Sequence, residues 1–156
     1  MSLRTDPNIL VDKKFIGIPY KFHGTKPETG MDCIGLMILY VKETFGIEMK
    51  YDDNRGPIME NWYVDSPGRF VDAFMNHGRA LNWASLRKND VPLFYGETVV
   101  NRYPTCLGIM IDDRHFLTTM EDRGSFVSIL NEHWKRIFWG GIRLHKFVEA
   151  GLSKWP

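Results

Sequence analysis

Residues 15–45 read FIGIPYKFHGTKPETGMDCIGLMILYVKETF, and the rest of the chain is best understood around them. The first half of this stretch is a loop that contains glycine and proline, and the second half is almost entirely apolar. Asp32 is a good N-cap residue, so a helix is predicted to begin at Cys33. The apolar side chains of Ile34–Val41 predict that this helix is enclosed on most sides. Gly46 predicts its end.

The thiol of Cys33 is predicted to lie in the first turn of this helix. There it would face backbone N–H groups without partners and the positive end of the helix dipole, a placement that lowers the pKa of a cysteine. The thiolate is the reactive form of the residue. Cys33 is therefore a candidate nucleophile, while a buried structural cysteine remains the alternative.

Two motifs in this stretch resemble the N-terminal half of the NlpC/P60 family. They are Gly17-Ile18-Pro19-Tyr20 and Asp32-Cys33-Ile34-Gly35-Leu36, separated by a loop with glycines. Members of this family are papain-like cysteine peptidases that cut peptidoglycan stem peptides, and the spacing looks like the branch found in phage tail-assembly proteins. The resemblance implies that Cys33 is the nucleophile position and that Tyr20, Asp32 and Ile34 border the substrate.

Length and composition indicate an ordinary globular protein. A chain of 156 residues, 44% of them hydrophobic, fits a single domain over residues 1–156 with a sizeable core. The formal net charge of +1 gives no electrostatic reason for binding nucleic acid or an anionic membrane. Two cysteines cannot build a disulfide scaffold, and the Cys and His spacing does not suggest a metal finger. We therefore expect no cofactor.

The N-terminal segment lacks the apolar core of a signal peptide, and no apolar run is long enough to span a bilayer. We expect a protein made in the host cytoplasm without a signal peptide and without membrane insertion. If it acts on a cell wall, another component must carry it there.

The chain is predicted to be mainly helical first and mainly strands afterwards. Helices are expected from Asp6-Pro7 to about Phe15, after Cys33, and from Ser66-Pro67 to Met75, with a surface loop over Glu48–Glu60. The predicted strands are Ala80–Leu86, Val91–Tyr95, Cys106–Ile111, His115–Met120, Ser125–Leu130 and Gly141–Phe147. Turns are expected at Arg87–Asp90 and Asp112–Arg114, and a short helix or turn at Trp134–Trp139. This order gives an α+β fold, and the resemblance implies that the Cys33 helix packs on an antiparallel sheet.

The second half resembles the family with informative departures. Leu86–Val91 looks like the family pattern L-x-x-G-D, with Asn89 in place of glycine. The next segment, which begins at Cys106, resembles the family's H-V-G-I-Y, whose histidine is the general base. Cys106 therefore stands at the base position, and Thr118 stands where a second polar residue, commonly histidine, orients the base. Beside the nucleophile, Ile34 replaces a serine.

These departures have chemical consequences. Cysteine peptidase chemistry needs a group that takes the nucleophile's proton and later gives it to the leaving amine. A neutral thiol, with an ordinary pKa of about 8.5, is a poor acceptor, and an ionised one would repel a Cys33 thiolate. His23, in the loop before Cys33, is a candidate for a recruited base, while a solvent-facing loop histidine is the alternative. His115 is expected at the surface, and His77, His133 and His145 form no catalytic constellation.

The resemblance brings Cys33 and Cys106 into one site. A disulfide is one interpretation, although it needs Cα atoms about 5.5–6 Å apart. A zinc site formed with His23 is another, although four ligands are not evident. Two reduced thiols in a small semi-buried pocket is the interpretation we favour.

Several aromatic residues allow two interpretations. They could line a groove for glycan or peptide, or they could be core and interface anchors; they are Trp62, Tyr63, Trp83, Trp134 and Trp139. Trp134, Phe138 and Trp139, near Lys135 and Arg136, would also suit docking to a partner protein.

Two functions follow from the sequence. The first is a structural or assembly component of a phage tail tip that keeps the peptidase-like fold with weak or no hydrolysis, and its partners would be tail or hub proteins. The second is an active peptidase that binds peptidoglycan peptide and cuts it through Cys33 with a recruited base such as His23. The lost histidine, Thr118 and Ile34 favour the first; the intact Asp32-Cys33 motif with Tyr20 favours the second.

Overall fold

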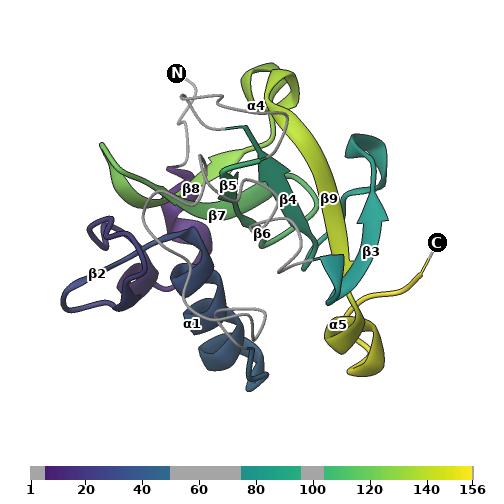
Figure 1. The fold of residues 1–156 in the computed structure, drawn as a ribbon, viewed down its shortest axis with the longest axis horizontal. Coiled ribbons are helices and arrows are strands. Elements are labelled where there is room, and N and C mark those ends of the chain that lie inside the picture. The colour runs from purple at the N-terminus through teal and green to yellow at the C-terminus, as the bar shows by residue number, and fades with distance from the viewer. Residues whose placement is uncertain (1–5, 50–74, 96–103, 156) are drawn as a thin grey trace.

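Antiparallel strands from the second half of the chain form the centre of the molecule (Figure 1). The computed structural model describes residues 6–49, 75–95 and 104–155. One sheet has the order β3-β9-β4-β5, and a second has the order β6-β7-β8. Their bounds are β3 Gly78–Leu81, β4 Val91–Phe94, β5 Cys106–Leu107, β6 Ile109–Met110, β7 His115–Met120, β8 Gly124–Ile129 and β9 Phe138–Leu144. The predicted combination of helices with an antiparallel sheet is confirmed.

Gly108 divides one predicted strand between the two sheets. Cys106–Ile111 was expected to be continuous, but β5 pairs with β4 and β6 pairs with β7. A Cβ atom on Gly108 would lie 2.5 Å from Cδ2 of Phe116 and 2.9 Å from the carbonyl oxygen of Leu117. Only glycine allows this close approach, so the chain can cross from one sheet to the other here.

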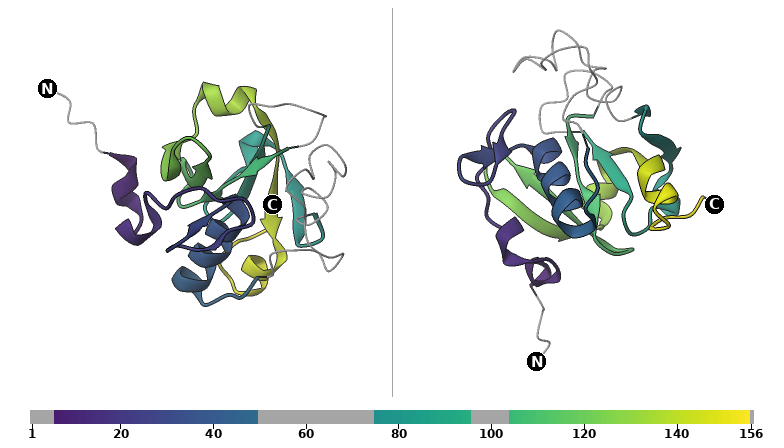
Figure 2. Two further views of the ribbon diagram at one scale, coloured as in Figure 1. Left: turned by 60° about the vertical axis from the view of Figure 1, so that its left-hand side comes forward. Right: turned by 90° about the horizontal axis from the view of Figure 1, so that it is seen from below.

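Helix α1, Cys33–Phe45, has the predicted bounds and caps. The Asp32 carboxylate accepts a hydrogen bond from the N–H of Gly35 at 2.8 Å, which satisfies one of the unpaired donors of the first turn. Gly46 ends the helix in the left-handed conformation with φ 71°. The helix lies against one face of the strands (Figures 1 and 2) and shares a core with Leu107, Ile109 and Leu117.

The N-terminal segment forms two short 3-10 helices, so the single helix expected up to Phe15 is wrong. They are η1, Pro7–Leu10, and η2, Lys13–Phe15. Asp6 and Asp12 each accept a hydrogen bond from a backbone N–H two residues later, which starts two separate turns with extended backbone between them. Asn8 accepts a hydrogen bond from the N–H of Val127 at 2.8 Å, so this segment covers the edge of β8.

The bounds of three further predicted elements differ in the structure. The strand expected over Ala80–Leu86 stops at Leu81, because Asn82 caps the 3-10 helix η3, Trp83–Ser85. The short helix or turn expected at Trp134–Trp139 is a helix that starts two residues earlier, α4 Glu132–Arg136, and β9 follows after Ile137. The closing strand expected to reach Phe147 ends at Leu144, where helix α5, His145–Glu149, begins.

The strands predicted at Val91–Tyr95, His115–Met120 and Ser125–Leu130 are confirmed to within one residue. The Glu48–Glu60 loop and the Ser66–Met75 helix fall almost entirely outside the described residues, as do Trp62 and Tyr63. Strands β1, Thr25–Lys26, and β2, Gly30–Met31, form a small hairpin before α1.

A second apolar cluster lies on the other side of the strands. It consists of Phe94, Met110, Phe116, Phe126 and Trp134. Trp134 is 6% exposed, and its indole N–H donates to Ser128 Oγ at 2.9 Å, so this side chain is a core residue and not a docking anchor. Trp83 and Trp139 are half-buried, and Trp83 packs edge-on against Phe138.

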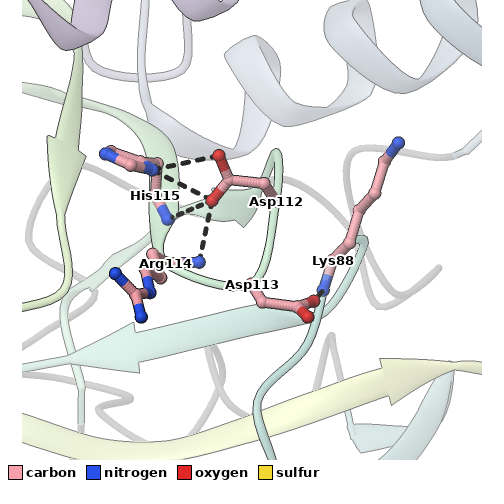
Figure 3. Close-up of a pocket in the computed structure, with 5 residues that line it drawn as sticks. All are labelled: Lys88, Asp112, Asp113, Arg114 and His115. Atoms are coloured by element: carbon pink, nitrogen blue, oxygen red, sulfur yellow. Dashed lines mark hydrogen bonds and ion pairs between the residues drawn. The ribbon is translucent and has the colours of Figure 1, made fainter. Parts of the chain in front are cut away.

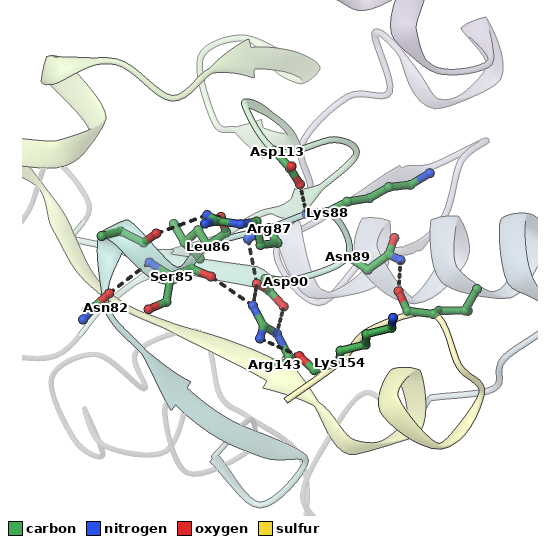
Figure 4. A network of polar contacts seen from close by, with 12 residues as sticks. Asn82, Ser85, Leu86, Arg87, Lys88, Asn89, Asp90, Asp113, Arg143 and Lys154 are labelled. Carbon is green, nitrogen blue, oxygen red and sulfur yellow. Dashed lines mark hydrogen bonds and ion pairs between the residues drawn. The ribbon is translucent and has the colours of Figure 1, made fainter. Parts of the chain in front are cut away.

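A buried ion pair joins three parts of the chain (Figure 4). The guanidinium of Arg143 donates two hydrogen bonds to the Asp90 carboxylate, at 2.9 and 2.8 Å. It also donates to the carbonyl oxygens of Ser85 and Lys154. The pair therefore holds β9, the segment before β4 and the C-terminal segment together. None of the helices among the described residues has the length and apolar character needed to cross a membrane.

Candidate functional site

The two motifs of the N-terminal half lie side by side because β2 pairs with the Pro19-Tyr20 segment. The N–H of Met31 donates to the carbonyl oxygen of Pro19 at 2.9 Å, and the N–H of Lys21 donates to the carbonyl oxygen of Met31 at 3.2 Å. Tyr20 and Met31 form an isolated parallel bridge. Since Asp32 and Cys33 follow Met31 directly, Tyr20 is placed beside the start of α1.

Asp32 anchors both the helix and the loop that precedes it. Its side chain is 5% exposed. One carboxylate oxygen accepts the N–H of Gly35, and the other accepts the N–H of His23 at 3.1 Å. A Cβ atom on Gly35 would lie 2.3 Å from the carbonyl oxygen of Gly24, so the loop touches the helix backbone here. Asp32 and Gly35 therefore stabilise the contact between the loop and the helix, independently of any contribution to binding.

The structure brings Cys33, Cys106 and Thr118 together. The side chains of Cys33 and Cys106 make a hydrogen-bonding contact, and both cysteines are free thiols. Cys106 Sγ lies 3.6 Å from Oγ1 of Thr118, whose hydroxyl donates to the carbonyl oxygen of Leu107 at 2.7 Å. The three positions that the resemblance assigned to nucleophile, base and orienting group are thus neighbours.

The contact between the thiols reverses the expected pKa of Cys33. The hydrogen bond to Cys106 raises the pKa of the Cys33 thiol well above its ordinary value, and burial and the negative charges of Cys106 and Asp32 act in the same direction. The N–H of Leu107 opposes them. The helix terminus was expected to lower this pKa, but the carboxylate of Asp32 already occupies that end of the helix.

Cys106 loses its proton before Cys33 does. The hydrogen bond from Cys33 lowers the pKa of the Cys106 thiol, and burial opposes this effect. The favoured ionised state of the pair is therefore a Cys33 thiol that donates to a Cys106 thiolate. This is the reverse of the charge distribution that a cysteine nucleophile needs.

Tyr20 completes the surroundings of the pair. Burial raises the pKa of its phenol, and the nearby groups of Cys33, Asp32, Glu121 and Cys106 raise it further. The half-buried phenol therefore stays protonated and can donate a hydrogen bond. Glu121, at the turn between β7 and β8, and the backbone of Leu107 were not predicted as site residues, because nothing in the sequence marks a turn carboxylate or a main-chain N–H.

His115 is not the plain surface residue that strand alternation predicted. Its Nδ1 lies 3.0 Å from the Asp112 carboxylate, and its side chain is 22% exposed. The same carboxylate accepts the backbone N–H groups of Arg114 and His115 (Figure 3). These residues, with Lys88 and Asp113, line a shallow pocket that includes neither cysteine of the pair.

The other histidines make separate contacts. His133 packs edge-on against Trp134, and His145 against Trp155. In residues 6–49, 75–95 and 104–155, no three side chains of His, Cys, Asp or Glu are grouped so as to hold a metal ion. The structure therefore does not assemble the zinc site considered for Cys33, Cys106 and His23.

Solved structures with a similar fold include NlpC/P60 proteins. A lipoprotein-like NLP/P60-family protein from Staphylococcus aureus Mu50 matches with a TM-score of 0.58 and 20% identity, over 85% of this chain and 38% of that one. An NlpC/P60 family protein from Bacillus cereus ATCC 10987 matches with 0.57 and 20%, over 83% and 36%. The fold is an NlpC/P60 fold.

A third NlpC/P60 structure has nearly the length of this chain. The NlpC/p60 domain of the peptidoglycan hydrolase SagA matches with a TM-score of 0.53 and 15% identity, over 84% of this chain and 91% of the domain. This chain therefore spans less than two fifths of the first two proteins but almost all of the isolated domain. No protein-family model and no curated protein matches the chain by sequence.

Proposed function

We propose that this chain is an NlpC/P60-like component of a phage tail tip, with a structural or assembly role and weak or no peptidase activity. The observation that carries the proposal is the contact between the Cys33 and Cys106 thiols. At the place where the resemblance puts a histidine base, the nucleophile position meets a second thiol. The assignment to a phage tail rests on the spacing of the two N-terminal motifs.

The electrostatics of the site support weak or absent hydrolysis. A cysteine nucleophile must be a thiolate beside a group that can return a proton to the leaving amine. Here the Cys33 thiol has a raised pKa, and the hydroxyl of Thr118 is committed to the carbonyl oxygen of Leu107. Neither Cys106 nor Thr118 replaces an imidazole near neutral pH.

An active peptidase with His23 as recruited base is the second candidate. It is favoured by the hydrogen bond from the His23 N–H to Asp32, which fixes the main chain of His23 next to the residue that precedes Cys33. In this mechanism His23 would take the Cys33 proton and pass it to the leaving amine.

The pH dependence of Cys33 alkylation distinguishes the two functions without a guess about the substrate. The reaction should be followed in a Cys106→Ser background, with Cys33→Ser/Cys106→Ser as the control for non-specific labelling. We expect an apparent pKa no lower than the ordinary value of about 8.5, unchanged by His23→Ala. An apparent pKa well below that value which rises on His23→Ala would favour the peptidase instead.

A Cys106→His variant tests the assignment of the base position. An imidazole placed beside Cys33 should lower the apparent pKa of its alkylation, because an imidazolium stabilises a neighbouring thiolate. Thr118→Val in the same background is the matched control for the orienting position. An alkylation profile unaffected by Cys106→His would contradict the assignment.

The tail assignment needs its own experiment. An antibody raised against the purified chain should label one end of the tail in virions of the phage that encodes it, when viewed by electron microscopy. Virions without label, together with a positive signal in the host lysate, would contradict the tail role and leave the conclusion about Cys33 untouched.

A further inference from the structure

Two thiols from distant parts of the chain meet beside the start of α1. Cys33 is 8% exposed in the first turn of that helix, and Cys106 is half-buried in β5. We propose that Cys33 and Cys106 form a thiol–disulfide exchange site, at which a low-molecular-weight disulfide converts the pair into an internal disulfide bond. The inference does not depend on the tail role.

The two cysteines come from neighbouring elements. Helix α1 and strand β5 are in contact, Cys33 shares an apolar cluster with Leu107, and its side chain interacts with that of Cys106. A disulfide needs Cα atoms about 4.4–6.8 Å apart. Strand β5 has two residues, pairs only with β4 in its sheet, and is followed by the break at Gly108. Any movement needed to close the bond therefore falls on an edge strand that is held in its sheet through β4 alone.

The two cysteines have different roles because their surroundings differ. Cys106 is the more exposed thiol, and its sulfur lies 3.6 Å from the hydroxyl of Thr118. Cys33 is buried in the first turn of α1, and the charge of the adjacent Asp32 carboxylate disfavours a thiolate there. Cys106 is therefore the attacking thiol, and Cys33 is the resolving thiol. This order is the opposite of the one that a peptidase would use.

The reaction proceeds in two exchanges. The Cys106 thiolate attacks one sulfur of the small disulfide RSSR; the new S–S bond forms, the old one breaks, and RS⁻ leaves and is protonated. The Cys33 thiol then loses its proton to solvent and attacks Cys106 Sγ, which expels the second RS⁻. The protein loses two protons and two electrons, equivalent to two hydrogen atoms, and RSSR becomes two RSH. A reducing thiol in excess reverses both steps.

The experiment uses the full chain in native buffer with excess oxidised glutathione, quenched with acid and analysed by intact mass. We expect the wild type to lose two hydrogen atoms and to retain no glutathione. Cys33→Ser should accumulate one glutathione on Cys106, because its resolving thiol is missing. Cys106→Ser should react at least about tenfold more slowly, since exchange depends on access and thiolate fraction.

Several results would overturn the inference. They are a stable glutathione adduct on the wild type, disulfide-linked dimers, equal rates in the two serine variants, and a wild type that reacts only after denaturation. The wild-type result requires no substitution, so a variant that fails to fold leaves the test intact. Circular dichroism of both serine variants, with Cys33→Ala as a second replacement, shows whether their rates can be compared.

Discussion

Replacing Asp90 with alanine should remove a large part of the protein's folding stability. The Asp90 carboxylate is fully buried, and it binds Arg143 through two hydrogen bonds and the N–H of Arg87 through a third. The substitution leaves the guanidinium of Arg143, which is 5% exposed, with only the carbonyl oxygens of Ser85 and Lys154. A buried positive charge then lacks its counterion.

The size of the expected loss of stability follows from the groups that lose their partner when Asp90 is removed. Removing one partner of a buried ion pair costs about 3–5 kcal/mol, and leaving the N–H of Arg87 without its acceptor adds about 1 kcal/mol. The expected loss of about 4–6 kcal/mol is a large share of the stability of a typical domain, about 5–15 kcal/mol. Combining Asp90→Leu with Arg143→Met should cost less than Asp90→Ala alone, because no unpaired charge remains buried.

Urea denaturation followed by tryptophan fluorescence measures these free energies of unfolding. Lys14→Ala is the matched control, since it breaks an exposed ion pair with Glu43 that solvent screens, and it should change the free energy of unfolding far less. If Asp90→Ala cost no more than Lys14→Ala, the ion pair would not hold the three segments together and the reasoning would be refuted.

Two further predictions concern the helix of Cys33 and the pH dependence of folding. Gly35→Ala should destabilise the protein by about 1–3 kcal/mol, because its Cβ would meet the Gly24 carbonyl oxygen, whereas Gly140→Ala meets nothing within 4 Å and should be nearly neutral in the same urea assay. Burial, with Lys146 and His145 nearby, lowers the pKa of His77. The unfolded chain therefore binds this proton at higher pH, so stability should be full above about 6.5 and fall as the pH drops below it. In His77→Gln, the urea midpoint should change less with pH between about pH 5 and pH 8 than in the wild type. An unchanged pH dependence of the midpoint would contradict this.

Local signals in the sequence were sufficient to predict the bounds of α1 and of three strands. Asp32 and Gly46 mark the two ends of α1 by chemistry that acts within one turn, and the apolar run between them has no competing interpretation. The predicted end of one strand was wrong because a nearby side chain caps a turn. Asn82 begins η3 inside an apolar run that looks like a continuing strand, and alternation alone does not reveal such a cap.

The grouping of the candidate site residues was predictable from the sequence, but their electrostatics were not. The neighbourhood of Cys33, Cys106 and Thr118 follows from the spacing that resembles the NlpC/P60 family. The direction of the Cys33 pKa was wrong, because it depends on a thiol that is distant in sequence and on the Asp32 carboxylate at the helix terminus. A rule that considers only the first turn of a helix omits both groups.

Two departures from the family pattern differ in kind. Asn89 stands in place of glycine with φ 75°, a left-handed conformation that asparagine tolerates, and its side chain donates to the carbonyl oxygen of Leu152 at 3.0 Å. This replacement keeps the turn before β4 and adds a contact with the C-terminal segment. Cys106 lies in a strand, as predicted, and by the resemblance it is a thiol at the position of a proton acceptor. A substitution can therefore preserve the backbone conformation at one position of a fold, while a substitution at another position changes the side-chain chemistry. For this reason the fold alone does not establish hydrolysis.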